Sequence, residues 1–127
     1  MTNKPKISEA EREVMNLLWE RSPLTSNEII TKLSDKMDWS DQTIKTFLGR
    51  LAKKEAIRFE KSGRNYLYYP CISQNEYLKT ENSAFLNKVY NGALNLLFSK
   101  FLEDENLSDT DLEKLQKILE KKKKGEL

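Results

Sequence analysis

The feature that most constrains the fold of this chain is a basic helical segment followed directly by two short strands rich in aromatic residues. The helical segment spans residues 40–54, begins at Ser40 and repeats apolar residues at helical spacing. The strands, residues 57–61 and 65–69, flank a turn at residues 62–64. A helix that leads into a β-hairpin with a basic tip is the layout of a winged helix-turn-helix domain. We predict that fold for this part of the chain.

Positive charge is concentrated in the same segment. Residues 42–67 hold seven Lys and Arg residues against two Glu residues, a local excess of +5, whereas the whole chain carries +2. Most Lys- and Arg-bearing helices are simply solvated charged faces. A basic hairpin beside such a helix favours contact with the DNA backbone instead. We therefore predict double-stranded DNA as a partner.

The outward side of this helix and the hairpin supply candidate contacts to DNA. Lys45 lies near the middle of the helix, where it can reach a base edge, whereas Arg50 is better placed for a phosphate. Gly63 permits the tight hairpin turn because glycine tolerates positive φ, and Arg64 beside it would clamp the backbone. The candidate DNA-binding residues are Gln42, Thr43, Lys45, Thr46, Arg50, Lys53, Arg58, Lys61 and Arg64. The residues of the helix expected in the core are Ile44, Phe47, Leu48 and Leu51.

Several other residues favour packing over a functional role. Side chains alternate along a strand, so the hairpin tyrosines are expected to pack at the root of the wing rather than to stack on bases; they are Tyr66, Tyr68 and Tyr69. Cys71 is expected to be a small packed residue rather than a redox sensor, since nothing nearby would lower its pKa. Trp19 and Trp39 are expected to be core and loop anchors.

Two short helices are predicted before the basic one. Ser8 and Glu11 form a capping box that starts the first helix, which ends at Ser22-Pro23. A second capping box at residues 25–28 starts a helix expected to end at Leu33, with a loop over residues 34–39. Three helices followed by a hairpin complete the predicted winged helix.

The character of the chain changes after Pro70. A capping box at Ser73 opens a helix expected to continue to about Phe101, and Ser108 opens a last helix, with an acidic loop at residues 103–106 between them. Residues 73–120 carry five Lys and Arg against nine Asp and Glu, so this half is not built for nucleic acid. The tail of residues 121–124 is expected to be frayed and solvated.

Two helices cannot enclose a core with their own residues, and the first of these is apolar over more than one stripe. Pairing with a second copy is the simplest remedy, and a two-fold dimer is the commonest symmetry. The residues expected between the two chains are Phe85, Val89, Leu94, Leu97, Phe98, Phe101, Leu112, Leu115 and Leu119. We predict a mainly α chain with a small β-hairpin: a winged-helix DNA-binding domain over residues 1–72 and a helical dimerisation domain with a basic tail over residues 73–127.

Composition argues against several other functions. With no histidine and one cysteine, a zinc site of common ligand spacing and the usual Ser–His or Cys–His catalytic pairs cannot be assembled. We therefore expect no enzyme activity, no metal and no cofactor. No apolar run approaches the roughly 20 residues of a membrane span, and no apolar signal-peptide core follows the N-terminus. Together with the single cysteine, this predicts a cytoplasmic location.

The chain resembles the penicillinase-repressor (BlaI/MecI-type) family of winged-helix regulators, and the similarity spans nearly its whole length. The stretches that carry it are residues 7–16, 39–51 with Lys53-Lys54, 63–70, 85–92 and 101–108. The resemblance implies a homodimeric repressor that binds an inverted repeat ahead of β-lactam-resistance genes. It also implies a membrane sensor for β-lactam and release of repression by proteolysis in the dimerisation region. The family positions carried over to the DNA interface are Gln42, Lys45, Thr46 and Arg50.

Two departures from the family pattern matter, and one feature of copper-responsive relatives is missing. The family often has Gly after the Lys-Lys pair, where a helix would end in a left-handed residue, and Glu55 stands there in this chain. The family's cleaved bond, Asn before Phe, falls on Lys100-Phe101. The C-terminal Cys-x-Cys pair of copper-responsive relatives is missing, so copper sensing through such a tail is excluded.

Two other functions stay open at this point. One is a winged-helix regulator of another operon that responds to a small ligand held between its two halves. The other is a protein-interaction module whose basic face meets an acidic partner. Competition with random DNA distinguishes a DNA-binding regulator from such a module, because specific DNA binding survives excess random DNA whereas a charge-only interaction does not.

Overall fold

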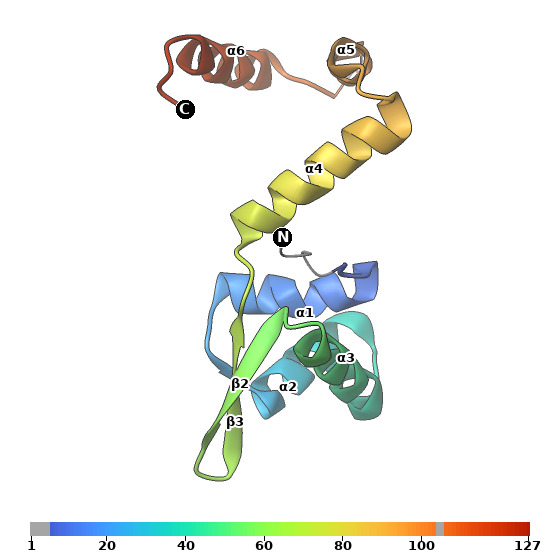
Figure 1. Ribbon diagram of the computed structural model, residues 1–127, viewed down its shortest axis with the longest axis vertical. Helices are drawn as coiled ribbons and strands as arrows, with labels where there is room; N and C mark the ends of the chain where they lie inside the picture. Colours follow the sequence, from blue (N-terminus) through green and yellow to red (C-terminus); the bar gives the residue numbers. More distant parts are fainter. Residues whose placement is uncertain (1–5, 104–105) are drawn as a thin grey trace. The chain divides into compact units, whose positions relative to one another are not determined.

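The computed structural model describes residues 6–103 and 106–127, which form two compact units, one ending at Lys79 and the other beginning at Thr80. The first unit contains α1 (Glu9–Glu20), β1 (Leu24–Thr25), α2 (Ser26–Met37), α3 (Asp41–Lys53), β2 (Ile57–Ser62), β3 (Asn65–Pro70) and the start of α4 (Gln74–Tyr90) (Figure 1). The second contains the rest of α4, α5 (Leu94–Glu103) and α6 (Asp109–Lys123). The predicted fold class, mainly helical with a small sheet, is confirmed.

Side-chain caps fix where the helices begin. Ser8 and Thr25 form the reciprocal capping boxes expected for α1 and α2, and Ser108 forms a further one at the expected start of α6. At the expected box before α4, Ser73 accepts a hydrogen bond from the Glu76 amide. Ser40 accepts a hydrogen bond from the Thr43 amide at the start of α3. These contacts satisfy backbone N–H groups that have no partner inside a helix.

Helix α2 is one turn longer than predicted. It continues past Leu33 to Met37, and Asp38 then adopts the left-handed conformation at φ 56° with its amide bonded to the Ser34 carbonyl. Met37 packs against the buried core. The predicted loop over residues 34–39 is therefore wrong for its first part, because the extra turn covers apolar surface.

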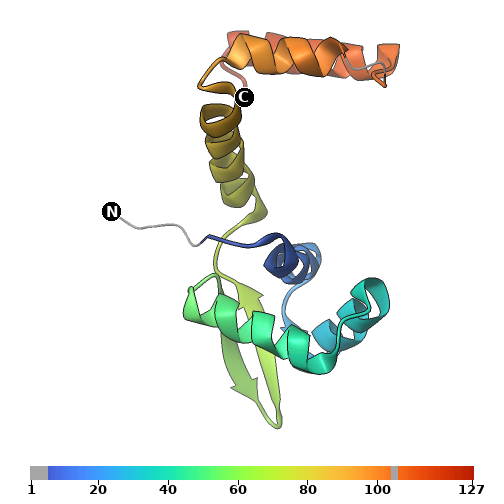
Figure 2. The same ribbon diagram turned by 90° about the vertical axis from the view of Figure 1, so that its right-hand side faces the viewer.

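The sheet has a third strand that sequence patterns did not indicate. Strand β3 lies between β1 and β2 and is antiparallel to both. Leu24 is paired with Tyr68, and Thr25 with Leu67. A strand of two residues is too short to show the alternation by which strands are recognised. The tip of the β2–β3 hairpin projects beyond the three helices as a wing (Figures 1 and 2).

The core of the first unit lies between α1, α2, α3 and the root of the sheet. It is a single cluster of buried apolar residues: Ile7, Val14, Met15, Leu18, Leu24, Ile29, Leu33, Ile44, Leu48, Leu51, Ala56, Ile57, Ile72 and Tyr77. Trp19 packs against this core, donates a hydrogen bond of 2.8 Å to the Ile72 carbonyl and lies 5.2 Å from the Tyr77 ring, measured between ring centroids. The start of α4 is thereby held against α1.

The predicted continuous helix from residue 73 to about Phe101 is wrong, since α4 and α5 are separate. Asn91 at φ 51° and Gly92 at φ 81° both lie in the left-handed region. The Gly92 amide bonds to the Leu86 carbonyl and closes α4. Asn and Gly adopt this conformation more readily than other residues. The apolar pattern runs across the break and hides it.

The C-terminal segment also differs from expectation. Helix α6 continues through Lys123, so residues 121–123 are helical rather than a frayed tail. Their positive charges lie near the negative end of the helix dipole, which stabilises the last turn. Within the predicted acidic loop, Glu103 ends α5, while residues 104–105 lie outside the described residues.

Candidate nucleic-acid interface

Helix α3 has one buried face and one exposed, basic face. Ile44, Leu48 and Leu51 are buried in the core as predicted, whereas Phe47 is only half-buried and packs edge-on against Trp39. Five of the predicted contact residues on this helix are exposed: Gln42, Lys45, Thr46, Arg50 and Lys53. The structure therefore brings these side chains onto the outer side of one rigid element.

Two threonines of α3 are partly engaged within the helix. Thr43 is half-buried, and its hydroxyl lies 2.9 Å from the Ser40 hydroxyl. Thr46 Oγ1 donates a hydrogen bond of 2.9 Å to the Gln42 carbonyl. The lone pairs and methyl group of Thr46 remain at the exposed face.

The predicted basic residues of the wing do not share one face. Strand pairing places Lys61 opposite Tyr66, and Arg58 opposite Tyr69. Because side chains alternate along a strand, Lys61 lies on the same face as Phe59, and Arg58 lies on the other. Arg58 donates a hydrogen bond of 2.6 Å to Glu60, and its guanidinium lies 4.0 Å from the Tyr69 ring centroid.

An open groove of about 290 Å³ separates α3 from the wing. The residues that line it are Ser26, Lys45, Leu48, Gly49, Ala52, Phe59, Tyr66 and Tyr68. Phe59 and Tyr66 are 51% and 42% exposed, and their rings meet edge-on at 5.4 Å. Sequence patterns did not single out Ser26, Gly49 or Phe59, because only the tertiary fold sets them beside each other.

The tyrosines of the hairpin differ in burial. Tyr68 and Tyr69 are half-buried, in agreement with packing at the wing root, whereas Tyr66 is exposed. Burial, with a smaller contribution from the neighbouring Tyr66, raises the pKa of the Tyr68 phenol. Tyr68 therefore remains a neutral hydroxyl at physiological pH.

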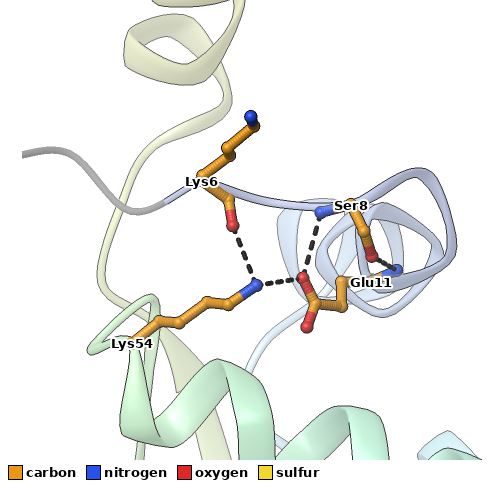
Figure 3. A network of polar contacts seen from close by, with 4 residues as sticks. All are labelled: Lys6, Ser8, Glu11 and Lys54. Atoms are coloured by element: carbon orange, nitrogen blue, oxygen red, sulfur yellow. Dashed lines mark hydrogen bonds and ion pairs between the residues drawn. The ribbon is translucent and has the colours of Figure 1, made fainter.

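A polar network anchors the C-terminal end of α3 to the start of α1 (Figure 3). Lys54 Nζ donates hydrogen bonds to the Lys6 carbonyl at 2.8 Å and to the carboxylate of Glu11, which is 2% exposed. The Ser8 amide donates to the same carboxylate oxygen at 3.0 Å. Burial alone would raise the pKa of Glu11, but these hydrogen bonds and the charge of Lys54 outweigh it and lower that pKa. Lys54 therefore stabilises the fold through these contacts.

The residue after Lys54 adopts the unusual backbone conformation that the family pattern implies. Glu55 has φ 64°, and the Ala56 amide bonds to the Leu51 carbonyl as α3 ends. Side chains other than glycine fit this region poorly. Helix α3 therefore ends in the left-handed residue that the resemblance implies, with glutamate in place of glycine.

The second unit exposes much apolar surface. Of the predicted dimerisation residues, two are half-buried, Leu97 and Leu115, and seven are exposed: Phe85, Val89, Leu94, Phe98, Phe101, Leu112 and Leu119. Neither α5 nor α6 contains a buried residue. The predicted cleavage bond lies within α5, where Lys100 and Phe101 are both exposed and Lys100 forms an ion pair with Glu103 at 3.5 Å.

Cys71 is exposed, so the prediction that it is packed is wrong; its amide bonds to the Ala56 carbonyl at the edge of the hairpin. Within residues 6–103 and 106–127, no three His, Cys, Asp or Glu side chains cluster closely enough to hold a metal ion. In that part of the chain, no helix combines the length and apolar character needed to cross a bilayer.

Comparison with known proteins agrees with this geometry. Residues 7–121 match the family described as penicillinase repressor. The penicillinase repressor of Bacillus licheniformis is 42% identical over 123 residues, covering 97% of this chain and 96% of its own length. The methicillin resistance regulatory protein MecI of Staphylococcus aureus (strain N315) is 39% identical over 123 residues, covering 96% of this chain and all of its own.

Two solved structures resemble the first part of the chain. The DNA-binding domain of the repressor BlaI superimposes with a TM-score of 0.56 at 44% identity, covering 61% of this chain and 94% of that one. The monomeric form of Bacillus licheniformis BlaI in complex with the blaP half-operator gives a TM-score of 0.54 at 44% identity, with the same coverage. The winged-helix prediction and the family resemblance are both confirmed. This chain belongs to the penicillinase repressor family.

Proposed function

We propose that this chain is a homodimeric, sequence-specific DNA-binding repressor of β-lactam-resistance genes that acts in the cytoplasm on an inverted-repeat operator. The observation that carries the proposal is the exposed basic face of α3, fixed by its buried apolar face and flanked by a projecting wing. Similarity to the penicillinase repressor and to MecI supports the proposal that the regulated genes are β-lactam-resistance genes. Enzyme activity forms no part of the proposal.

The residues of α3 take different roles in this proposal. Lys45 reads a base edge from the middle of the helix, and Gln42 and Thr46 add contacts on the same face. Arg50 and Lys53, one or two turns further on, pair with phosphates and set the position of the helix on the duplex. Thr43 supports the start of the helix through Ser40, and when Ser40 donates the hydrogen bond between the two hydroxyls, the Thr43 hydroxyl donates its own proton to a phosphate.

On the wing, Arg64 and Lys61 bind DNA phosphates beside the groove of the duplex that α3 reads. Arg58 contacts DNA only by exchanging Glu60 for a phosphate, since its guanidinium is held by that carboxylate and by Tyr69. Both residues of the Arg58–Glu60 pair are more than half exposed, so the exchange costs little.

The second unit joins two copies in this proposal. Its exposed apolar residues need a partner, and a two-fold dimer places two α3 helices on two half-sites. Linking the half-sites multiplies their affinities through effective concentration. Cleavage near Lys100-Phe101 by a regulatory protease, after a sensor detects β-lactam, would remove α6 and part of the apolar surface, so the operator would be released.

A gel-shift titration on the intergenic DNA upstream of the chain's own gene tests the function. The chain should bind this DNA in the presence of excess random competitor. Lys45→Ala should weaken binding about 5- to 100-fold, the equivalent of roughly 1–3 kcal/mol, and change base preference at one position. Lys88→Ala, on the second unit, is the matched control and should bind normally. If excess random DNA abolishes binding, the interaction depends on charge alone and the proposal is contradicted.

The dimer is tested with the fragment of residues 1–79, which keeps the contact between Trp19 and Tyr77. It should be monomeric in analytical ultracentrifugation and bind a half-site as the intact chain does, but bind the full operator far more weakly. A dimeric fragment, or one as tight as the intact chain on the full operator, contradicts this assignment.

A further inference from the structure

The C-terminal half of α6 carries a dense positive charge that the proposed function does not use. Residues 114–124 contain six Lys and one Glu, so their local excess is +5. The equal excess of α3 and the wing is spread over the longer range of residues 42–67. The acidic average of residues 73–120 hides this segment, because most of its positive charge lies beyond residue 120.

Four of these lysines form a row along one side of α6. A helix turns by about 100° per residue, so residues three, seven and ten positions after Lys114 fall within an arc of about 80°. We call this set the lysine row, and all of its members are exposed: Lys114, Lys117, Lys121 and Lys124. The apolar residues of α6 centre about 140° away around the helix. They are Leu112, Leu115, Ile118 and Leu119. The lysine row therefore stays open to solvent when a second copy covers the apolar side.

Folding does not account for the lysine row. Within the described part of the chain, none of the four lysines forms an ion pair. Attraction to the negative end of the helix dipole falls off beyond the last turn, so it does not explain Lys114 and Lys117. The end of the row is held in helical form, because the Glu126 amide bonds to the Lys121 carbonyl at 2.9 Å and Gly125 adopts φ 74°.

The dimensions of the lysine row match a DNA backbone. Ten residues of helix rise about 15 Å, and one DNA strand carries a phosphate about every 3.4 Å along the duplex axis. The row therefore spans about four phosphates. Glu113 and Glu120 border one edge of the row, which leaves four lysines against two carboxylates on this side of α6.

An anionic membrane fits the lysine row less well than DNA does. A helix that lies in a membrane interface buries its apolar side in the bilayer. Because the row centres about 140° from the apolar residues of α6, that orientation would turn the lysines away from the lipid headgroups. DNA can reach the row while the apolar side is covered by a second copy.

We propose that the lysine row is a second DNA-binding surface, which holds duplex phosphates that α3 and the wing do not contact. The contact is independent of sequence, because lysines that bind phosphates read no base edge. The inference rests on the proposed function and adds to it a DNA contact on the second unit. Since α6 carries the row as well as part of the apolar surface, cleavage near Lys100-Phe101 would remove a DNA contact together with part of the dimer interface.

The test replaces two lysines of the row in the full-length chain. The row variant combines Lys117→Gln with Lys121→Gln. The matched control combines Lys122→Gln with Lys123→Gln, which removes two charges from the same end of α6 on other sides of the helix. Titrations on the upstream intergenic duplex at several salt concentrations compare both with wild type. Circular dichroism and sedimentation equilibrium check that helix content and dimerisation are equal.

The row variant should bind this duplex about fivefold or more weakly at low salt, with base preference unchanged. Its slope of log affinity against log salt should fall by at least about 1.8, which is 0.9 for each of two phosphate contacts. The control should lose less than about half of that slope. A rescue variant, Lys117→Arg with Lys121→Arg, keeps both charges and should bind as wild type does.

The outcomes separate this inference from the proposed function. If wild type binds specifically but the row variant loses no more slope than the control, the lysine row is overturned and the repressor function stands. If wild type shows no specific binding, both fall. The row is also overturned if both variants bind DNA equally and only the row variant fails to bind vesicles of phosphatidylglycerol and phosphatidylcholine in equal parts, because the lysines then serve a membrane. A loss confined to the row variant and restored by arginine supports the DNA contact.

Discussion

Lys54 at the C-cap of α3 donates a hydrogen bond to the buried carboxylate of Glu11 in the first turn of α1. The contact joins residues 43 positions apart and ties the end of the DNA-facing helix to the N-terminal helix. Lys53, one residue earlier, is exposed. Neighbouring lysines of one basic run thus serve different purposes, one in folding and one in binding.

The first prediction concerns this pair. Lys54→Ala leaves the Glu11 carboxylate buried with only its Ser8 hydrogen bond, and should lower the free energy of unfolding by about 1–3 kcal/mol. Lys53→Ala should change stability by less than about 0.5 kcal/mol while weakening DNA binding. Urea denaturation followed by circular dichroism measures both. Equal stability of the two variants would show that the network of Figure 3 contributes nothing.

The second prediction is a pH dependence. The pKa of Glu11 is lowered on folding, so its ionised form adds stability that is fully present above the unfolded-state pKa near 4.5. That stability is lost as the pH falls through the lower folded-state pKa. Glu11→Gln should therefore be less stable than wild type at pH 7, and the gap should close below about pH 4.5. Glu28, whose pKa is also lowered, is common to both proteins, so the difference isolates Glu11. A gap that stays constant from pH 7 to pH 3 would contradict the argument.

The third prediction concerns the left-handed residue after α3. Glu55→Gly removes the steric cost of a side chain at φ 64° and should raise the free energy of unfolding by about 1 kcal/mol. Glu55→Ala keeps a Cβ in the same conformation and serves as the control, with no comparable gain. Thermal denaturation of the three proteins measures this. An equal gain in both variants would mean that the glutamate charge, and not the backbone, was responsible.

The fourth prediction separates two arginines of the wing. Arg64→Ala should weaken binding to all DNA sequences and reduce the slope of log affinity against log salt by about 0.9, the loss of one phosphate contact. Arg58→Ala should have a smaller effect on the slope, because Arg58 is held by Glu60 and Tyr69. Titrations at several salt concentrations supply both slopes. A change in base preference for Arg64→Ala would show that the wing tip reads a groove instead.

The fifth prediction concerns dimerisation. Phe98→Glu places a charge on the exposed apolar surface of α5 and should raise the dimer dissociation constant at least tenfold. Ser99→Glu adds the same charge one residue away, about 100° around the helix, and should have a much smaller effect. Sedimentation equilibrium measures the constant, and half-site binding should be unchanged in both variants. Dimers of equal strength in the two variants would place Phe98 outside the interface.

Local sequence determined much of this protein. Each capping box marks the start of a helix and can be recognised locally, because its two partners lie three residues apart, as at Ser8 and Glu11. Apolar spacing fixed which face of α3 is buried, and so which residues are exposed for DNA. Gly63 between two aromatic runs predicted the hairpin, and the stretches similar to the penicillinase-repressor family indicated the family.

Tertiary structure decided what depends on contacts between distant residues. Strand β1 forms because it pairs with β3, and the extra turn of α2 forms because Met37 packs against the core. The break at Asn91-Gly92 depends on two left-handed residues within an uninterrupted apolar pattern, so periodicity could not show it. Lys54 looked like another surface cation until the fold placed Glu11 beside it. The groove between α3 and the wing likewise arises only when Gly49 and Phe59, on separate elements, are brought to face each other, because a binding surface is a property of packing and not of spacing along the chain.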